Sequence, residues 1–295
     1  MIHKMEKNKG GSMKILCTGS LGMLGSAIKN VFVNHQCLFT DIESLDVRYW
    51  RDWEKYLYYC PDVVLHLAAM TDLEQCQRFA EQAYFTNAIG TTNAVEYCKR
   101  FMIPLVYIST AGVFDGKKTR FESYTEEDLP EPINHYGRSK YYGDLATFAY
   151  PYTYIFRNGW AFGGGKGIDK KFVYKIIQQF DNTKEIFALS DVYGSPTYTY
   201  DLAKIILGAI EKKIPYGTYN AAGLGVASRY DVAKFICEVL RPDIKVSPVE
   251  AGYFSDTFFC TRAQNEVLSM DKIQNQGIQG CRYWKNSLEE YLKNV

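Results

Sequence analysis

The feature that most constrains the fold is an apolar segment that runs straight into a glycine-rich turn and then into a helical pattern. Residues 14–18 (KILCT) predict a short buried strand, and residues 19–25 (GSLGMLG) have the spacing Gly-x-x-Gly-x-x-Gly. Glycines there allow a tight turn and a close approach of the backbone to a phosphate, which the following helix N-terminus would face. The alternative is a glycine-rich turn without a ligand. The residues that we expect to contact a dinucleotide here are Gly19, Gly22, Met23, Leu24 and Gly25.

The alternation of strand and helix continues along the chain. We expect further strands at residues 37–40, 63–67, 105–108 and 153–156, and an amphipathic helix from about residue 81 to 100. The strand at 63–67 is apolar except for His66, as is typical of a parallel strand covered on both faces. The pattern predicts an α/β fold with a Rossmann-like, doubly wound parallel sheet.

Acidic residues follow the strand at 37–40. Asp41 can accept hydrogen bonds from the ribose hydroxyls of adenosine and would repel a 2′-phosphate, so it favours NAD over NADP. Glu43 could do the same, and a surface or capping role for Asp41 is the alternative. Asp46 and Val47 follow where a loop could lie beside the adenine.

Small and hydroxyl-bearing residues follow the next two strands. Ala68 and Ala69 leave room for a ligand at the carboxyl end of the strand at 63–67, where parallel sheets bind cofactors. Ser109 and Thr110 end the strand at 105–108 and would point into the same crevice. His66 is more simply a satisfied core histidine than a catalyst.

A tyrosine and a lysine stand four residues apart at the start of a predicted helix, in the octet INHYGRSK (133–140). At that spacing Tyr136 and Lys140 share one helix face, so the lysine ammonium can lie near the phenol. Lowering the pKa of a tyrosine from near 10 to near 7 takes about 4 kcal/mol, which a fixed cation in a partly dry site can supply. The pair therefore indicates a tuned acid or base, although such pairs also arise by chance.

Composition excludes several classes of protein. The 295 residues carry a formal net charge of +1 without a basic block, so nucleic acid is not an expected partner. We find neither an apolar run of membrane-spanning length nor the apolar core of a signal peptide, and we expect no membrane contact and a cytoplasmic location. The eight cysteines are scattered, which predicts reduced thiols, and we expect no metal site.

Taken together, these motifs resemble the extended short-chain dehydrogenase/reductase superfamily, and within it the dTDP-4-dehydrorhamnose reductase-like branch. The resemblance covers nearly the whole chain from Met13. The stretches that carry it are DVVLHLAAMT (62–71), NAIGTTNAVEYCKR (87–100), YISTAGVFDG (107–116), YTEEDLPEPINHYGRSKYYGD (124–144), FRNGWAFGGG (156–165) and GSPTYTYDLA (194–203).

The resemblance implies a catalytic set of Thr110, Tyr136 and Lys140, with NAD(H) or NADP(H) as cofactor. The implied reaction is hydride transfer to the C4 carbonyl of a nucleotide-linked 4-keto-6-deoxyhexose. Tyr136 would protonate the alkoxide, Lys140 would hold the nicotinamide ribose and lower the tyrosine pKa, and Thr110 would hydrogen-bond the carbonyl oxygen.

The resemblance also assigns binding residues outside the catalytic set. Asn87 and Ser109, together with the Tyr136 and Lys140 pair, are expected at the cofactor. The expected substrate contacts are Thr71, Asn134, Trp160 and Arg262. Core packing is the alternative for Trp160.

One departure from the residue pattern of the branch concerns the contacts to the sugar. Where the branch usually has Asp-Tyr after Ser-Thr, this chain has Ala111 and Gly112, so an expected polar contact to the sugar is missing and the pocket is roomier. A second departure is Ala263, which replaces proline in a signature that otherwise matches Arg262 and Asn265. The sugar therefore does not follow from the resemblance.

We expect three regions: a disordered or tag-like leader at 1–12, an NAD(P)-binding Rossmann domain at 13–155, and a region at 156–295 that completes the sheet and forms a smaller substrate-binding lobe. The loop GGGKG (163–167) would be a flap or turn over the site.

A homodimer is possible. The alternatives are a nucleotide-sugar epimerase or dehydratase, and a non-catalytic dinucleotide-binding subunit resembling that of methionine adenosyltransferase.

Overall fold

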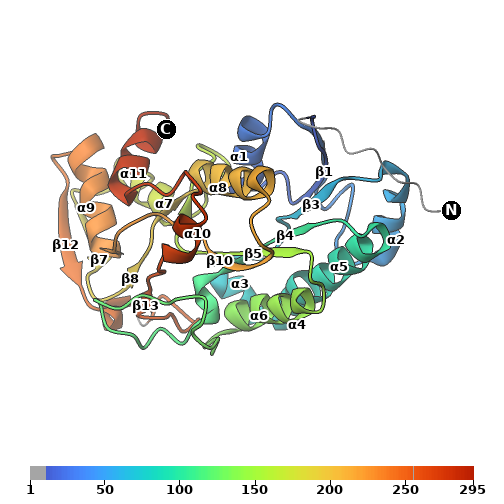
Figure 1. Cartoon of the computed structure of the whole chain (residues 1–295). Helices are drawn as coiled ribbons and strands as arrows, with labels where there is room; N and C mark the ends of the chain where they lie inside the picture. The colour runs from blue at the N-terminus through green and yellow to red at the C-terminus, as the bar shows by residue number, and fades with distance from the viewer. Residues whose placement is uncertain (1–10, 255) are drawn as a thin grey trace.

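The structure is a computed structural model that describes residues 11–254 and 256–295. The predicted leader at 1–12 lies almost wholly outside these residues. A six-stranded sheet forms the centre of the molecule (Figure 1). Its strands, in spatial order, are β10 (Gly217–Asn220), β5 (Thr153–Asn158), β4 (Leu105–Thr110), β3 (Val63–His66), β1 (Lys14–Thr18) and β2 (Gln36–Phe39).

All neighbouring strands of this sheet pair in parallel. The predicted α/β fold and its five strands are therefore confirmed, and the sixth strand, β10, comes from the second half of the chain. After β1 the chain passes to β2 on one side and then returns to β3 on the other. This reversal is the topological switch point at which such sheets bind ligands, beyond the carboxyl ends of the strands.

Helices cover both faces of the sheet, and alternate strand residues explain how. Ile15 and Val106 pack in one core with α1 (Met23–Val31) and α8 (Thr199–Lys212), which also contact each other. Leu16 and Leu105 point to the opposite face, where they pack with α5 (Gly90–Phe101) and α2 (Trp50–Glu54). Both faces are buried, as the apolar strand sequences require.

The helical stretch predicted at 81–100 is present but not uniform. It consists of α4 (Ala80–Tyr84), a π-helical turn (Phe85–Ile89) and α5. Before it lies α3 (Leu73–Arg78), and after β4 comes α6 (His135–Phe148), which packs on α4 and α5. Isolated π turns are common near functional sites, and here the turn lies under α6.

The remaining elements build a second, smaller core at one end of the molecule, around α9 and α11 (Figure 1). This core contains α7 (Phe172–Ile177), α9 (Arg229–Leu240), α11 (Trp284–Leu292) and the parallel pair β7 (Glu185–Leu189) and β12 (Lys245–Val249). Ser228 caps α9 in a capping box with Asp231. The predicted division of the chain between residues 155 and 156 stays a prediction.

The remaining elements are short. They are β6 (Ala161–Phe162), β8 (Tyr193–Gly194), β9 (Thr197–Tyr198), β11 (Ala227–Ser228), β13 (Asn265–Glu266), α10 (Asp271–Asn275), and the 3₁₀ turns Leu57–Tyr59, Ala111–Val113 and Ala251–Phe254. Within the part of the chain that the structure describes, none of the helices combines the length and the apolar character needed to cross a membrane.

Candidate active site

A cavity of about 1280 Å³ opens at the carboxyl ends of the central strands and extends to the second core. This volume exceeds the roughly 300–1,000 Å³ of a pocket for one drug-sized ligand. All predicted site residues except Asn87 line it. They are Gly19, Gly22, Met23, Leu24, Gly25, Asp41, Asp46, Val47, Ala68, Ala69, Thr71, Ser109, Thr110, Asn134, Tyr136, Lys140, Trp160 and Arg262.

The glycine-rich turn forms one end of the cavity. Gly19 has φ +68°, and a Cβ there would lie 2.6 Å from the backbone nitrogen of Ala68. A Cβ on Gly25 would lie 2.5 Å from the carbonyl oxygen of Ser20. Gly22 is the N-cap of α1 and supplies no capping side chain, so the first N–H groups of the helix are left for a ligand. The turn therefore fits a dinucleotide phosphate.

The acidic residue after β2 is fixed against this turn. One carboxylate oxygen of Asp41 accepts a hydrogen bond from the Leu21 N–H at 2.8 Å, and the other accepts from the Ile42 N–H at 2.9 Å. Asp41 lines the cavity. Glu43, the alternative ribose acceptor, is not among the lining residues. Of the two acidic residues, Asp41 is therefore the one placed to meet a ligand.

Asp46, further along, is engaged by an arginine. Its carboxylate accepts hydrogen bonds from Nε of Arg48 at 2.8 Å and from the terminal guanidinium nitrogen at 2.6 Å. These bonds hold the pKa of Asp46 below its usual value. Arg48 also lines the cavity, so a cation lies where only an acid was predicted.

Tyr136 and Thr110 both line the cavity and are neighbours there. Thr110 is the last residue of β4, and Tyr136 lies in the first turn of α6. Burial raises the pKa of Tyr136, while the neighbouring Thr110 hydroxyl opposes the rise and the charges of Cys76 and Glu266 add to it. A phenol in such a site stays protonated at neutral pH.

Lys140 lies one turn further along α6, and its ammonium is 4.1 Å from the centre of the Tyr107 ring. Burial lowers the pKa of Lys140 to about 7, and the nearby Asp144 opposes the change. The predicted lowering of the Tyr136 pKa by Lys140 is not among the influences on that tyrosine. The structure thus places Tyr136 and Lys140 in one site, but it does not show that Lys140 lowers the pKa of Tyr136.

Two predicted binding residues have structural partners. Asn87 is fully buried; its amide oxygen accepts from the Met70 N–H at 2.8 Å, and its nitrogen donates to the Met70 carbonyl and to Ser139 Oγ, both at 2.9 Å. Asn134 is the N-cap of α6 and accepts from the Gly137 N–H at 2.8 Å. Its nitrogen donates to the Thr261 carbonyl at 2.9 Å. Asn134 still lines the cavity, whereas Asn87 does not.

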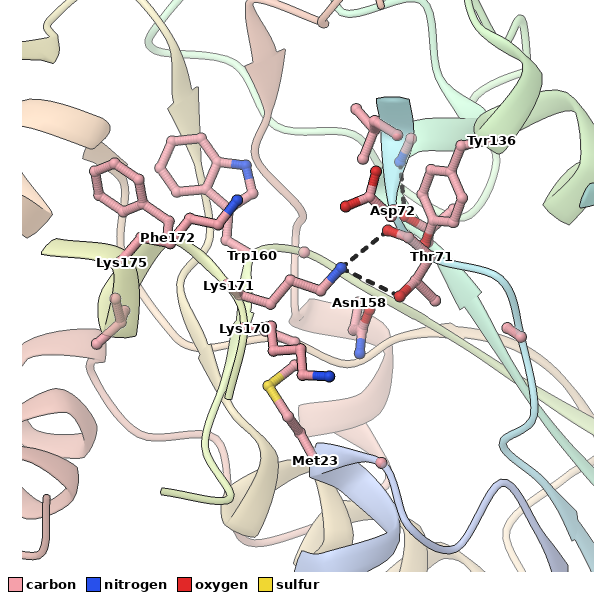
Figure 2. Close-up of a pocket in the computed structure, with 18 of the residues that line it drawn as sticks. Met23, Thr71, Asp72, Tyr136, Asn158, Trp160, Lys170, Lys171, Phe172 and Lys175 are labelled. Carbon is pink, nitrogen blue, oxygen red and sulfur yellow. Dashed lines mark hydrogen bonds between the residues drawn. The ribbon is translucent and has the colours of Figure 1, made fainter. Parts of the chain in front are cut away.

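Two contacts join the halves of the molecule across the cavity. Nζ of Lys171 donates to the carbonyl oxygen of Thr71 at 2.9 Å and to its hydroxyl at 3.1 Å. Figure 2 shows this lysine crossing the space between Trp160 and Tyr136. Arg262 forms an ion pair with Glu74 at 2.9 Å. Thr71 and Arg262, both predicted as substrate contacts, are thus also contacts between the halves.

Trp160 forms the wall opposite Tyr136. Its indole N–H donates to Glu266 at 2.7 Å, and the guanidinium of Arg229 lies 3.5 Å from the ring centre. Trp160 has φ +29°, a strained value for a bulky residue of the kind that occurs at functional sites. The indole therefore belongs to the cavity wall rather than to a closed core.

With this geometry established, comparison with known proteins identifies the family. The RmlD substrate binding domain family matches residues 13–295. The chain belongs to this family. The predicted place in the extended short-chain dehydrogenase/reductase superfamily is confirmed.

Individual relatives are similar over their whole length. The spore coat polysaccharide biosynthesis protein SpsK of Bacillus subtilis is 30% identical over 289 residues, which are 95% of this chain and 97% of that protein. A dTDP-4-dehydrorhamnose reductase from Clostridium acetobutylicum has a TM-score of 0.90 and 33% identity, with 96% and 99% of the chains covered. The Bacillus anthracis dTDP-4-dehydrorhamnose reductase, solved in complex with NADP, has a TM-score of 0.88 and 28% identity, with 96% and 100% covered.

Several cavity residues were missed by the sequence analysis. Lys171 and Arg229 come from the second half of the chain and have no motif of their own. Glu266 follows directly on Asn265, which was noted, and the small residues Ala111 and Gly112 were a signal that a side chain from elsewhere in the chain borders the space beside them. Arg48 stands two residues after the noted Asp46.

Proposed function

We propose that the protein reduces the C4 keto group of a nucleotide-linked 4-keto-6-deoxyhexose with NADH or NADPH. One observation carries the proposal: the glycine-rich turn and the Thr110, Tyr136 and Lys140 set line the same cavity. The names of the full-length relatives, among them dTDP-4-dehydrorhamnose reductases, support the substrate class.

The side chains have distinct roles in the proposed reaction. The reduced nicotinamide supplies the hydride. Tyr136, kept protonated by burial, donates its phenolic proton to the developing alkoxide at C4. The Thr110 hydroxyl, at the end of β4, donates a hydrogen bond to the same oxygen. Lys140 binds and orients the cofactor ribose through its buried ammonium.

The charge of the cavity supports a nucleoside diphosphate on the substrate. Besides Lys171, which donates to Thr71, four cationic side chains line it without an ion pair to any residue that the structure describes: Lys140, Lys170, Lys175 and Arg229. Phosphate oxygens are the partners that such free ammonium and guanidinium groups prefer. The last three come from the second half of the chain, which also supplies Trp160 and Phe172, so the diphosphate would bind on this side of the cavity, and the sugar would extend toward Tyr136.

The cytoplasmic location and the homodimer stay predictions. Most of the eight cysteines are buried free thiols, which suits a reducing compartment. The location is tested by fractionation of the source cells, and the homodimer by light scattering on the purified chain.

The activity is tested by following NADH and NADPH oxidation with dTDP-4-dehydro-L-rhamnose generated in situ. We expect turnover with at least one of the two cofactors. Measurable cofactor binding without oxidation, for this and other 4-keto sugar nucleotides, would contradict the proposal. That result would favour the non-catalytic dinucleotide-binding subunit, whose mark would be co-purification with a partner enzyme.

A further inference from the structure

A gap in the cavity wall lies directly beside Tyr136. After Thr110 the chain has Ala111 and Gly112, both buried. A Cβ on Gly112 would lie 3.6 Å from Cε1 of Tyr136 and 3.6 Å from Oε1 of Glu266. The space left at residue 112 is therefore only large enough for a Cβ, and it is bordered by the tyrosine on one side and by the Glu266 carboxylate on the other.

Glu266 is held firmly at this position. It lies on β13, where it pairs in register with Gly194 of β8. The preceding Asn265 anchors the strand, because its side-chain nitrogen donates to the carbonyls of Thr119 at 2.6 Å and Glu122 at 3.0 Å. The backbone of Glu266 is thus fixed, which is what a binding residue requires.

The side chain of Glu266 is oriented as well. Oε2 accepts the indole N–H of Trp160 at 2.7 Å, and Arg229 stacks on the indole. Arg229 in turn lies 4.8 Å from the centre of the Phe172 ring. No described residue donates to Oε1, the oxygen that borders the space above Gly112. One oxygen is therefore committed to the protein and the other is free for a ligand in the cavity.

The chemistry of the proposed substrate limits which group can meet this oxygen. The C4 oxygen has to lie at Tyr136. On a 4-keto-6-deoxyhexose, the neighbouring C5 carries a methyl group and the ring oxygen, neither of which donates a hydrogen bond. The donor nearest to C4 is the substituent on C3. A carboxylate that borders the tyrosine is thus placed to accept from C3 rather than from C5.

We infer that Glu266 is a specificity-determining residue, which selects sugars that carry a hydrogen-bond donor on C3. The inference rests on the proposed function and adds to it. The donor is a hydroxyl or a protonated amine, since a carboxylate accepts from both. A site built to hydrogen-bond a substrate group rejects an analogue that lacks the group, because the partner on the protein is then left unpaired.

The test measures kcat/KM of the wild type and Glu266→Gln with three dTDP-4-keto-6-deoxyhexoses, which carry a hydroxyl, a hydrogen or an amine on C3. Glutamine can keep the bond to Trp160 but replaces the free acceptor with an NH₂ group. We expect Glu266→Gln to lower kcat/KM roughly 10- to 100-fold for the preferred C3 donor and less than about threefold for the 3-deoxy sugar. The relative rates with hydroxyl and amine identify the donor.

Two comparisons make the result decisive. Glu81→Gln, on the exposed surface of α4, is the matched control and should leave all three values unchanged. An equal loss of kcat/KM with all three sugars would mean that Glu266 only supports Trp160. No loss of kcat/KM would mean that Glu266 does not contact the sugar. Either result overturns the inference while the reductase activity stands. A wild type that reduces none of the sugars would overturn the proposed function, and the inference with it.

Discussion

The ammonium of Lys140 lies 4.1 Å from the centre of the Tyr107 ring, in a site where Lys140 is only 3% exposed. The aromatic face offers partial compensation for lost water, and Asp144 lies on the same helix. Burial nevertheless lowers the lysine pKa to about 7. A buried charge at this position lowers the stability of the fold. A residue with a purely structural role would not need to be charged here, so the lysine points to a function.

Replacing this lysine should therefore stabilise the fold and abolish activity. We expect Lys140→Met to raise the free energy of unfolding at pH 7 by about 1–3 kcal/mol, since a buried charge gives way to an apolar chain of similar length. The folded pKa lies below the unfolded value of 10.5, so the charge is most costly below pH 7. The advantage of the mutant should shrink as pH rises from 7 to 10.5.

Urea unfolding at pH 6.5 and pH 9.5 measures this difference. A mutant that is less stable than the wild type at both values would contradict the inference that Lys140 is retained for function. Lys99→Met, on the exposed end of α5, is the control and should show no such pH dependence.

The Lys171–Thr71 contact should matter for substrate binding more than for chemistry. Lys171→Met removes both hydrogen bonds between the N-cap of α7 and the segment after β3. We expect KM for the sugar nucleotide to rise about 3- to 10-fold with kcat changed less than twofold, because the contact positions the wall of the cavity. Steady-state kinetics beside Lys55→Met, a surface control at the C-cap of α2, check this. A fall in kcat at unchanged KM would assign Lys171 to the chemical step.

The conformation of the glycine-rich turn should be required for cofactor binding. Gly19→Ala places a Cβ 2.6 Å from the Ala68 nitrogen at φ +68°. We expect the cofactor Kd to rise at least about tenfold, with a loss of stability of about 1–3 kcal/mol from the strained backbone. Gly252→Ala, where nothing lies within 4 Å of the added Cβ, is the control for calorimetric titration. Unchanged affinity in Gly19→Ala would contradict this role of the turn.

Asp41 should set the preference between the two cofactors. We expect the wild type to prefer NADH, and Asp41→Asn to shift the Kd ratio toward NADPH by about fivefold, the effect of removing about 1 kcal/mol of repulsion. Glu43→Gln is a matched control, because Glu43 stands two residues after Asp41 in the chain but does not line the cavity. A shift in Glu43→Gln instead would assign the ribose contact to Glu43. A shift in neither would leave Arg48 to set the preference.

The first half of the site could be predicted from the sequence because local rules determine it. A glycine turn between a strand and a helix has few possible conformations, and residues such as Asp41, Ala68 and Thr110 lie at or just after the carboxyl ends of strands, which must share one edge. Asn87 shows the limit of this reasoning. It lies in a π-helical turn, which its sequence did not indicate, and there its amide bonds to Met70 and Ser139.

The second half of the site depends on contacts between residues far apart in the chain. Glu266 meets Trp160 across 106 residues, and Lys171 meets Thr71 across 100. Glu266 stands on a strand of two residues, too short to give a periodic pattern. The positions of such side chains follow from the packing of short strands and loops, which propensity and periodicity do not determine.

The central claim is that Tyr136 donates the proton in the reduction, and Tyr136→Phe tests it most directly. The measurement is the rate of NADH or NADPH oxidation with dTDP-4-dehydro-L-rhamnose, beside calorimetric binding of the cofactor to both proteins. We expect kcat to fall about 10²- to 10⁴-fold while the cofactor Kd changes less than threefold, because phenylalanine keeps the ring and lacks only the proton donor. A mutant that keeps more than a tenth of the wild-type kcat would contradict the account.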